Sequence, residues 1–324
     1  MFEVSQIFVP VDTSRASMCA LRLAQSMRLS SRPGLEVFHV LPTLPDYMRA
    51  LLFPYAAMGE DVLEIEYELT MEARQKLEVS LELDAHTSLE CVMGDEREAI
   101  AGAMLRSPAN LTIMGAFGHS GARPHAIGST AAHIIRTATH PVLLTRDLHP
   151  SPTISHVLCA LDLSSHSHTT LEVALSLALE LDAKFSAIFV LPDPLVNNPH
   201  NLLSNHIKHS SEQILSRERS KLDALFERCF QMVDVPFPQR QRAAQMWRQR
   251  HILAGPVGQT IAHQADHLDA DLIVLGAAHA PDAPRPGATC LDVLHRATTH
   301  MLVVPNLPQP IASASSSSSS SQET

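Results

Sequence analysis

The stretch LTIMGAFGHSGARPHAIGSTAAHIIRTA, residues 111–138, decides the fold. It opens with an apolar run typical of a buried strand and closes with an amphipathic run typical of a helix. Between these runs the chain places four of its twelve glycines. A strand, a glycine-rich loop and a helix in this order are typical of an α/β protein, in which such a loop lies at the carboxyl end of the strand.

The same organisation occurs twice along the chain. FVPVDTS (8–14) and LCALDLS (158–164) each end an apolar run with an aspartate, and NLTIMGA (110–116) is matched by DLIVLGA (271–277). Five such matches in one order indicate two tandem copies of one domain. The three remaining pairs are VFHVLP (37–42) with AIFVLP (187–192), VMGDEREAI (92–100) with LAGPVGQTI (253–261), and TATHPVLLTR (137–146) with RATTHMLVVPN (296–306).

Each copy alternates short apolar runs with longer amphipathic stretches. Continuous strands rich in Val, Ile and Leu between helices are typical of a parallel sheet that is buried on both faces. The sequence therefore predicts an α/β protein with two tandem, doubly wound, five-stranded parallel-sheet domains of Rossmann-like type. In the first copy we expect strands near residues 6–12, 36–41, 88–93, 110–115 and 141–145.

These patterns divide the 324 residues into two domains, a linker and a tail. We expect the domains at residues 1–147 and 157–307, with a proline-containing linker over 148–156 between them. Residues 308–324 are rich in serine and cannot bury enough surface to offset the entropy of ordering, so we predict a disordered tail. The second copy is longer between its second and fourth strands, and we expect residues 193–250 to form a variable surface excursion.

The formal net charge of −10 disfavours a general nucleic-acid binder, which needs a positive field to displace phosphate counterions. One basic stretch, RQRAAQMWRQR (240–250), contains the only tryptophan and could in principle stack on single-stranded bases. Because the chain as a whole is acidic, we interpret this stretch as a solvated strand or loop edge. The sequence therefore predicts no nucleic-acid partner.

The chain has no apolar run near the ~18 residues that a membrane span requires, and its first residues do not resemble a secretory signal peptide. Its cysteines lie far apart and form no CxxC pair, which favours reduced thiols over disulfides or a zinc site. We therefore expect a cytoplasmic protein without membrane contact. The five cysteines are Cys19, Cys91, Cys159, Cys229 and Cys290.

The glycine loop does not match three well-known sequence motifs. It has neither the G-x-x-x-x-G-K-[ST] nor the G-x-G-x-x-G phosphate pattern, and Ala122 stands where a G-x-S-x-G nucleophile elbow requires glycine. What remains is Gly115-x2-Gly118-x9-Gly128, which Ser129 and Thr130 follow at the start of a helix. Glycines let a bound group approach the backbone, and a helix N-terminus capped by Ser129 or Thr130 suits an anion. The loop thus predicts a phosphate chain, with the sugar and base lying toward Asp12 and Val40.

At this point the sequence resembles the universal stress protein family over nearly all of residues 1–306. The resemblance rests on PVD (10–12), HVLP (39–42), the loop 114–130 and THPVLLTR (139–146). It implies the adenine-nucleotide alpha hydrolase-like variant of the fold and ATP, with or without Mg²⁺, as the ligand.

The resemblance also implies a role for each matching position of the first copy. Asp12 and the backbone of Val40 would hold adenine, and Met114 and Gly115 would lie against the base and the ribose. The remaining glycines and hydroxyls would take the phosphates. The full candidate set is Pro10, Asp12, Val40, Met114, Gly115, Gly118, Gly128, Ser129 and Thr130.

The second copy departs from this pattern. His279 stands at the second glycine position, and the Gly-Ser pair has become either Ala288-Thr289 or Thr289-Cys290, depending on a one-residue gap. Prolines in the loop remove N–H donors. Asp162 and Val190 are retained, so a ligand without phosphates stays open. We therefore predict one competent ATP site, in the first half; the loop prolines of the second half are Pro281, Pro284 and Pro286.

Nineteen histidines are many for this length. A metal site needs three or four converging ligands, and HQADH lacks the glutamate of the H-E-x-x-H motif, so we assign no metal-binding residue. So many groups that titrate near pH 6.5 could still make the protein sensitive to pH. The closest pairs are His166 with His168, His206 with His209, and His263 with His267.

The sequence thus favours an ATP-binding regulatory protein in the stress response that acts on an unidentified protein partner. The alternatives are a slow ATP-hydrolysing or adenylyl-transferring enzyme and a nucleotide-free scaffold. Around the loop only Arg123, His119 and His125 could clamp a reacting phosphate, so we assign no catalytic residue. The family resemblance also implies pairing through the last strands, 141–146 and 301–305, either within one chain or in a homodimer.

Overall fold

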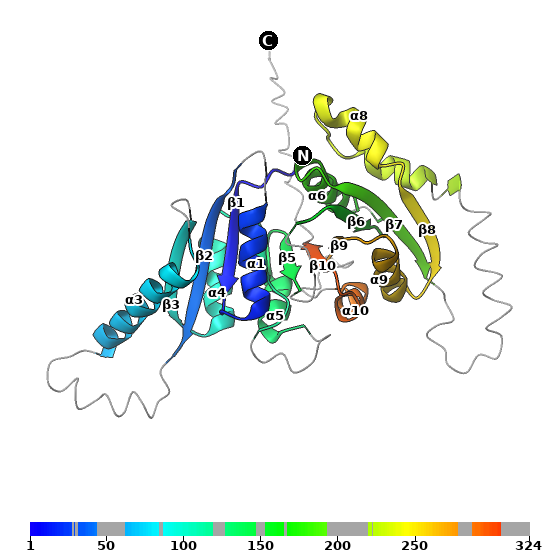
Figure 1. The fold of residues 1–324 in the computed structure, drawn as a ribbon. Coiled ribbons are helices and arrows are strands. Elements are labelled where there is room, and N and C mark those ends of the chain that lie inside the picture. The colour runs from blue at the N-terminus through cyan, green and yellow to red at the C-terminus, as the bar shows by residue number, and fades with distance from the viewer. Residues whose placement is uncertain are drawn as a thin grey trace, which may run out of the picture.

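The computed structural model confirms an α/β fold made of two similar halves (Figure 1). It describes residues 1–27, 29, 32–43, 62–83, 87–118, 127–146, 153–164, 167–192, 220–221, 223–277 and 287–305. The first half contains β1 (Gln6–Val11), α1 (Arg15–Ser26), β2 (Gly34–Pro42), α3 (Val62–Ser80), β3 (Thr87–Gly94), α4 (Glu96–Arg106), β4 (Leu111–Gly115), α5 (Ser129–Thr137) and β5 (Val142–Thr145). The second half contains β6 (His156–Ala160), α6 (Ser167–Glu180), β7 (Lys184–Pro192), α8 (Phe237–Met246), β8 (Arg250–Gly255), α9 (Val257–His267), β9 (Leu272–Gly276), α10 (Ala288–Arg296) and β10 (His300–Val304).

The two halves share one sheet of ten strands in the order β3-β2-β1-β4-β5-β10-β9-β6-β7-β8. Within each half all pairs are parallel, whereas β5 and β10 pair antiparallel, with Leu143 opposite Leu302. The two five-stranded sheets expected from the sequence therefore merge into one. The pairing of last strands occurs within the chain, which was one of the two arrangements left open.

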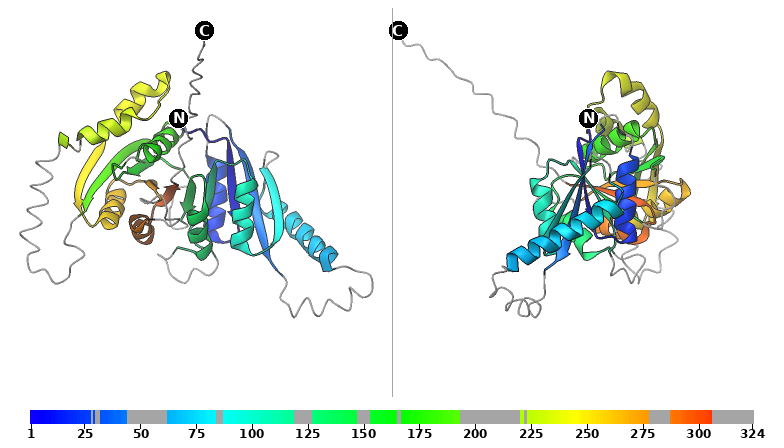
Figure 2. Two further views of the ribbon diagram at one scale, coloured as in Figure 1. Left: turned by 180° about the vertical axis from the view of Figure 1, so that it is seen from behind. Right: turned by 60° about the vertical axis from the view of Figure 1, so that its left-hand side comes forward.

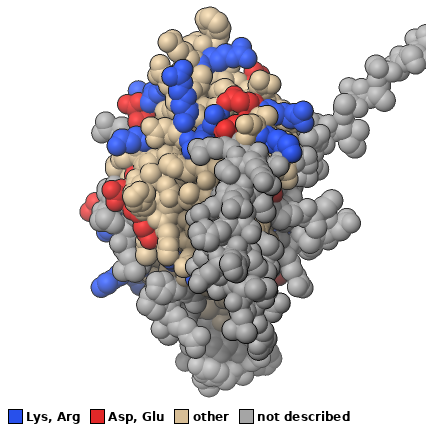
Figure 3. Space-filling model, turned by 90° about the vertical axis from the view of Figure 1, so that its right-hand side faces the viewer, with Lys and Arg blue, Asp and Glu red and all other residues tan. Residues whose placement is uncertain are grey.

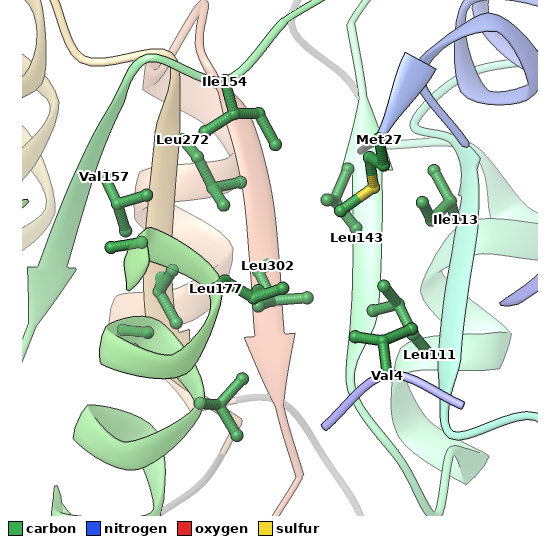
Figure 4. Packing of buried hydrophobic residues seen from close by; sticks show 14 of the residues in the cluster. Val4, Met27, Leu111, Ile113, Leu143, Ile154, Val157, Leu177, Leu272 and Leu302 are labelled. Carbon is green, nitrogen blue, oxygen red and sulfur yellow. The ribbon is translucent and has the colours of Figure 1, made fainter. Parts of the chain in front are cut away.

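Alternation along the strands sends side chains to two layers of helices. Ile7 and Val9 join the cluster packed under α1, α3, α6 and α8, whereas Phe8 joins the cluster under α4, α5, α9 and α10. Helices therefore cover both faces of the twisted sheet (Figure 2). The cluster under α1, α3, α6 and α8 continues across the β5–β10 junction, because Leu143 and Leu302 both belong to it (Figure 4).

Part of the segment expected as a surface excursion, residues 193–250, packs against the core. Residues 223–231 and α8 are helical, and Trp247 lies buried between Phe226 and Phe230, with ring centroids 5.5 and 5.2 Å away. The interpretation of 240–250 as a strand or loop edge is therefore wrong for its first seven residues, which belong to α8. Because Trp247 is packed in the core, it offers no stacking surface to a nucleic acid.

Two arginines of this stretch form ion pairs. Arg242 pairs with Asp182, and Arg250 pairs with Glu227. Acidic side chains lie among the basic ones over the upper part of this face (Figure 3). Residues 193–219, most of the predicted linker and the serine-rich tail lie outside the described residues.

Candidate functional site

The first turn after β1 fixes Asp12 at the carboxyl edge of the sheet. Asp12 Oδ1 accepts a hydrogen bond from the Ser14 N–H at 2.9 Å, and the Asp12 N–H donates to Ser17 Oγ at 3.3 Å. Between them Thr13 has a φ of 63°, a left-handed conformation that is costly for a β-branched residue. Ser14 then caps α1 through its side chain. The backbone and the helix start thus hold the carboxylate in one orientation.

The glycine positions bring the loop after β4 against this turn. A Cβ on Gly118 would come within 2.9 Å of Asp12 Oδ2, so the loop approaches the carboxylate as closely as glycine allows. A Cβ on Gly115 would come within 2.9 Å of the Ser17 backbone nitrogen. Gly115 is therefore explained by the packing of β4 against α1, and Gly118 by the shape of the site.

Helix α5 begins without a side-chain cap. Its N-cap is Gly128, which makes no side-chain capping bond, and the Gly128 N–H donates to the Ala116 carbonyl at 2.8 Å. The expected cap by Ser129 or Thr130 is wrong, because both residues already belong to the helix. The Thr130 hydroxyl donates instead to Glu96 Oε2 at 3.2 Å. The first turn of α5 therefore presents backbone N–H groups that no helical carbonyl accepts.

The residues predicted from the sequence line one cavity of about 710 Å³. Its volume lies within the range of ligand pockets, about 300–1,000 Å³. Phe38 and Met114 form part of an apolar inner wall, and the start of α5 forms part of a polar rim. All nine predicted residues line it: Pro10, Asp12, Val40, Met114, Gly115, Gly118, Gly128, Ser129 and Thr130.

Five polar residues of the cavity were missed from the sequence: Ser17, His39, Thr43, Asp95 and Glu96. His39 projects from β2 and its Nδ1 bonds the Val11 carbonyl at 2.7 Å. Asp95 and Glu96 follow β3, and Asp95 caps α4 by accepting from two backbone N–H groups. Their position directly after an expected strand was the signal that could have found them, because parallel strands end at one edge.

The described wall of the cavity is acidic. It carries the carboxylates of Asp12, Asp95 and Glu96, and among the lining residues that the structure describes there is no Lys or Arg. Arg123, His119 and His125, the sequence candidates for a phosphate clamp, lie outside the described residues.

Comparison with known proteins identifies the family. The model of the universal stress protein family matches twice, at residues 3–146 and 153–305. The chain belongs to the universal stress protein family. A universal stress protein structure from Pseudomonas aeruginosa UCBPP-PA14, described as putative, is similar at 18% identity, a TM-score of 0.59 and 93% coverage of both chains. One from Archaeoglobus fulgidus DSM 4304 is similar at 18% identity and a TM-score of 0.57, covering 94% of this chain and 99% of that one. No curated protein matches.

The second universal stress protein domain repeats the aspartate turn. The Ser164 N–H donates to Asp162 Oδ1 at 3.0 Å, and Leu163 has a φ of 58°. Helix α6 begins at Ser167, after this turn, and Asp162 and Ser167 line a second cavity of about 310 Å³.

The helix that follows the second loop corrects the sequence alignment. Gly287 is the N-cap of α10 and its N–H donates to the Ala277 carbonyl at 2.5 Å, as Gly128 donates to Ala116. Gly287 is thus the counterpart of Gly128, and Ala288 that of Ser129. Neither pairing considered from the sequence is right, because both overlooked that this glycine is retained.

Other candidate features carry no assigned role. Among the described residues no group of three or more His, Cys, Asp and Glu side chains could hold a metal ion. His263 and His267 lie on α9, whereas His166, His206 and His209 lie outside the described residues. All five cysteines are free. No helix in the described part of the chain is long and apolar enough to cross a membrane.

Proposed function

We propose that the first domain binds ATP and that its occupancy regulates an interaction with a protein partner during stress. The observation that carries this proposal is the convergence of Asp12, Gly118 and the uncapped start of α5 on one cavity. A carboxylate beside an apolar wall suits a base with hydrogen-bond donors. The N-terminus of α5, which no side chain caps, suits a phosphate.

The division of the cavity supports an adenine nucleotide placed along the strand ends. Pro10, Phe38, Val40 and Met114 surround the inner part, which suits the flat adenine ring. Gly118, which packs against Asp12, and the first turn of α5 would meet the phosphates. A glycine at position 118 would leave room for the ligand beside its backbone N–H, because a side chain there would point at Asp12.

The acidic rim favours ATP bound together with Mg²⁺. Triphosphate beside Asp95 and Glu96 is repelled unless a cation lies between them, and Mg²⁺ prefers oxygen ligands. The Glu96 carboxylate and the Thr130 hydroxyl, 3.2 Å apart, offer such oxygens at the start of α5. These residues fit a magnesium-bound nucleotide, in which the ion would neutralise phosphate charge.

Regulation rather than catalysis agrees with the charges of the site. Transfer of a phosphoryl or adenylyl group needs cationic stabilisation of the developing negative charge. Among the described lining residues no arginine or lysine supplies it. We therefore expect bound ATP to persist and to act as a signal whose presence shifts the population of a partner-binding state.

The proposal is tested by the nucleotide that the protein carries. The chain is purified in Mg²⁺, denatured, and the released ligand is identified by chromatography and mass. We expect ATP at about one per chain. Protein that releases no nucleotide and also fails to bind added Mg-ATP would overturn the proposal and favour the scaffold. ADP appearing during a single-turnover incubation would favour the enzyme.

A further inference from the structure

The second cavity lies at the same place in its domain as the first. The sheet register fixes the correspondence, because β2 pairs with β3 as β7 pairs with β8. Pro42 lies opposite Gly94, and Pro192 lies opposite Gly255. Val40 therefore corresponds to Val190, and the residues that follow β3 correspond to those that follow β8. Differences between the two linings can be read position by position.

The polar rim of the first cavity has lost its carboxylates in the second. His39 and Glu96 are replaced by Phe189 and Val257, which line the second cavity. Asp95 and Ser129 are replaced by Pro256 and Ala288, which are not among its lining residues, whereas Thr130 is matched by Thr289, which is.

The floor of the second cavity is apolar as well. Ile261 and Leu275 stand where the first half has Ile100 and Met114. Cys290 lines it from α10, and burial raises the pKa of this thiol to about 12. The thiol is therefore neutral near pH 7 and behaves as a small apolar group.

The polar features that are retained are the helix start at Gly287 and Thr289 and the aspartate turn. Asp162 Oδ1 accepts from the Ser164 N–H and from the Ser167 hydroxyl, so the carboxylate is held in place. Asp162 carries the only charge among the described residues that line this cavity. A ligand must then offer a hydrogen-bond donor to the carboxylate and an apolar surface to the walls.

We propose that the second cavity binds an uncharged, phosphate-free nucleoside. Its flat heteroaromatic ring would lie between Val190 and Leu275, with a donor group facing Asp162. The choice of a nucleoside rests on the proposed function, since the retained part of the site is the part that would hold the base in the first half. The volume of about 310 Å³, less than half that of the first cavity, also favours the smaller ligand.

Phosphates are disfavoured here, although the bare helix start is retained at Gly287, because the carboxylates that could hold a cation in the first half are missing. The position of Glu96 is Val257, so a cation has no carboxylate to hold it beside the helix start. A phosphate would then face Asp162 without a compensating cation among the described lining residues, which is unfavourable in a partly enclosed site. The first half would therefore bind the nucleotide and the second half the nucleoside.

The test titrates adenosine into protein saturated with Mg-ATP and follows binding by calorimetry. Two variants address the second cavity: Asp162→Asn keeps the shape of the turn, and Val257→Trp places a large side chain at a partly exposed position on the rim. Asp12→Asn is the matched variant of the first half. Thermal unfolding of each variant shows that it is folded.

We expect adenosine to bind the ATP-loaded protein. Its Kd should rise tenfold or more in both second-half variants, because Asp162→Asn loses a charged hydrogen bond and Val257→Trp fills space in the cavity. Asp12→Asn should weaken ATP and leave adenosine unchanged. The inference is overturned if adenosine fails to bind, or if neither second-half variant changes its Kd. Adenosine binding that depends on Asp162 in a protein that binds no ATP would sink the proposed function and leave this inference standing.

Discussion

At the scale of single residues, the two aspartates show that one conformation can serve two environments. Each aspartate is followed by a left-handed residue, Thr13 or Leu163, and accepts from the backbone N–H two positions on. Yet Asp12 shares its cavity with carboxylates, whereas the other walls of the Asp162 cavity are mainly apolar. The sequence predicted both aspartates because they end matched strands. It did not predict the surroundings of Asp12, because nothing in the matched stretches that contain His39, Asp95 and Glu96 shows which of their side chains line the cavity.

Replacing Gly118 by valine should abolish ATP binding without unfolding the protein. The new Cβ would come within 2.9 Å of Asp12 Oδ2, and the branched side chain would fill the space between the loop and the carboxylate. We expect the Kd for Mg-ATP, measured by calorimetry, to rise at least a hundredfold.

Gly34→Val is the matched control for this change. Its Cβ would meet only the Gln6 side chain, at 3.8 Å, so both folding and ATP binding should stay as in the wild type. Gly115→Val would be a poor test, because its Cβ collides with the backbone of α1 and should destabilise the domain. Equal ATP affinity in Gly118→Val and Gly34→Val would contradict the assigned role of Gly118.

Replacing Glu96 by glutamine should alter the dependence of ATP binding on Mg²⁺. The amide keeps an oxygen that can accept from Thr130 but loses the charge that would hold the cation. Titrations at several Mg²⁺ concentrations should show a Kd for ATP that falls less with Mg²⁺ than in the wild type. Glu98→Gln, on the same helix but not among the residues that line the cavity, is the control and should leave the curve unchanged.

At the scale of elements, the strands were predicted well and the helix ends poorly. Continuous apolar runs predicted the bounds of β1 and β4 to within a residue or two, because a strand that is buried on both faces is apolar along its whole length. The start of α5 was misplaced because a glycine cap leaves no side-chain signal. The helices of 223–246 were missed because their partner, the Trp247 cluster, forms only in the folded domain.

Two histidines at strand boundaries should make stability depend on pH. Burial lowers the pKa of His140, which hydrogen-bonds Thr112 at 2.8 Å, below its ordinary value of 6.5. Burial is also the largest cause lowering the pKa of His156, against an opposing bond to the Leu268 carbonyl. Both are therefore held neutral in the fold, whereas the unfolded chain takes up protons first.

This contribution to stability is present above about pH 6.5 and is lost as the pH falls through that value toward the lower pKa of the fold. We expect the unfolding midpoint to decrease between about pH 8 and about pH 5.5. The double variant His140→Gln/His156→Gln should show a shallower decrease. A midpoint that is constant over this range in the wild type would contradict the prediction.

At the scale of the whole molecule, the junction between the halves depends on Arg146. This buried residue donates from its guanidinium to the Leu294 carbonyl in the last turn of α10, and its backbone N–H donates to His300 Nδ1 at 3.1 Å. The guanidinium also lies over the ring of Phe117, 5.1 Å from its centroid, beside the first cavity. One side chain thus joins the β5–β10 seam to the candidate ATP site.

Arg146→Met should destabilise the chain by about 1–3 kcal/mol, because a buried carbonyl loses its donor while the aliphatic volume is largely kept. Urea unfolding measures the change. Arg136→Met, at an exposed position in the last turn of α5, is the control and should change stability by less than about 0.5 kcal/mol. Equal effects of the two changes would show that the junction does not depend on Arg146.

The central claim is that the two halves share a fold but only the first holds ATP. Calorimetric titration of nucleotide-free protein with Mg-ATP tests this most directly, because it counts the sites. We predict about one ATP per chain, lost in Asp12→Asn and unchanged in Asp162→Asn. A stoichiometry of two, or binding that is lost in Asp162→Asn and kept in Asp12→Asn, would contradict the account.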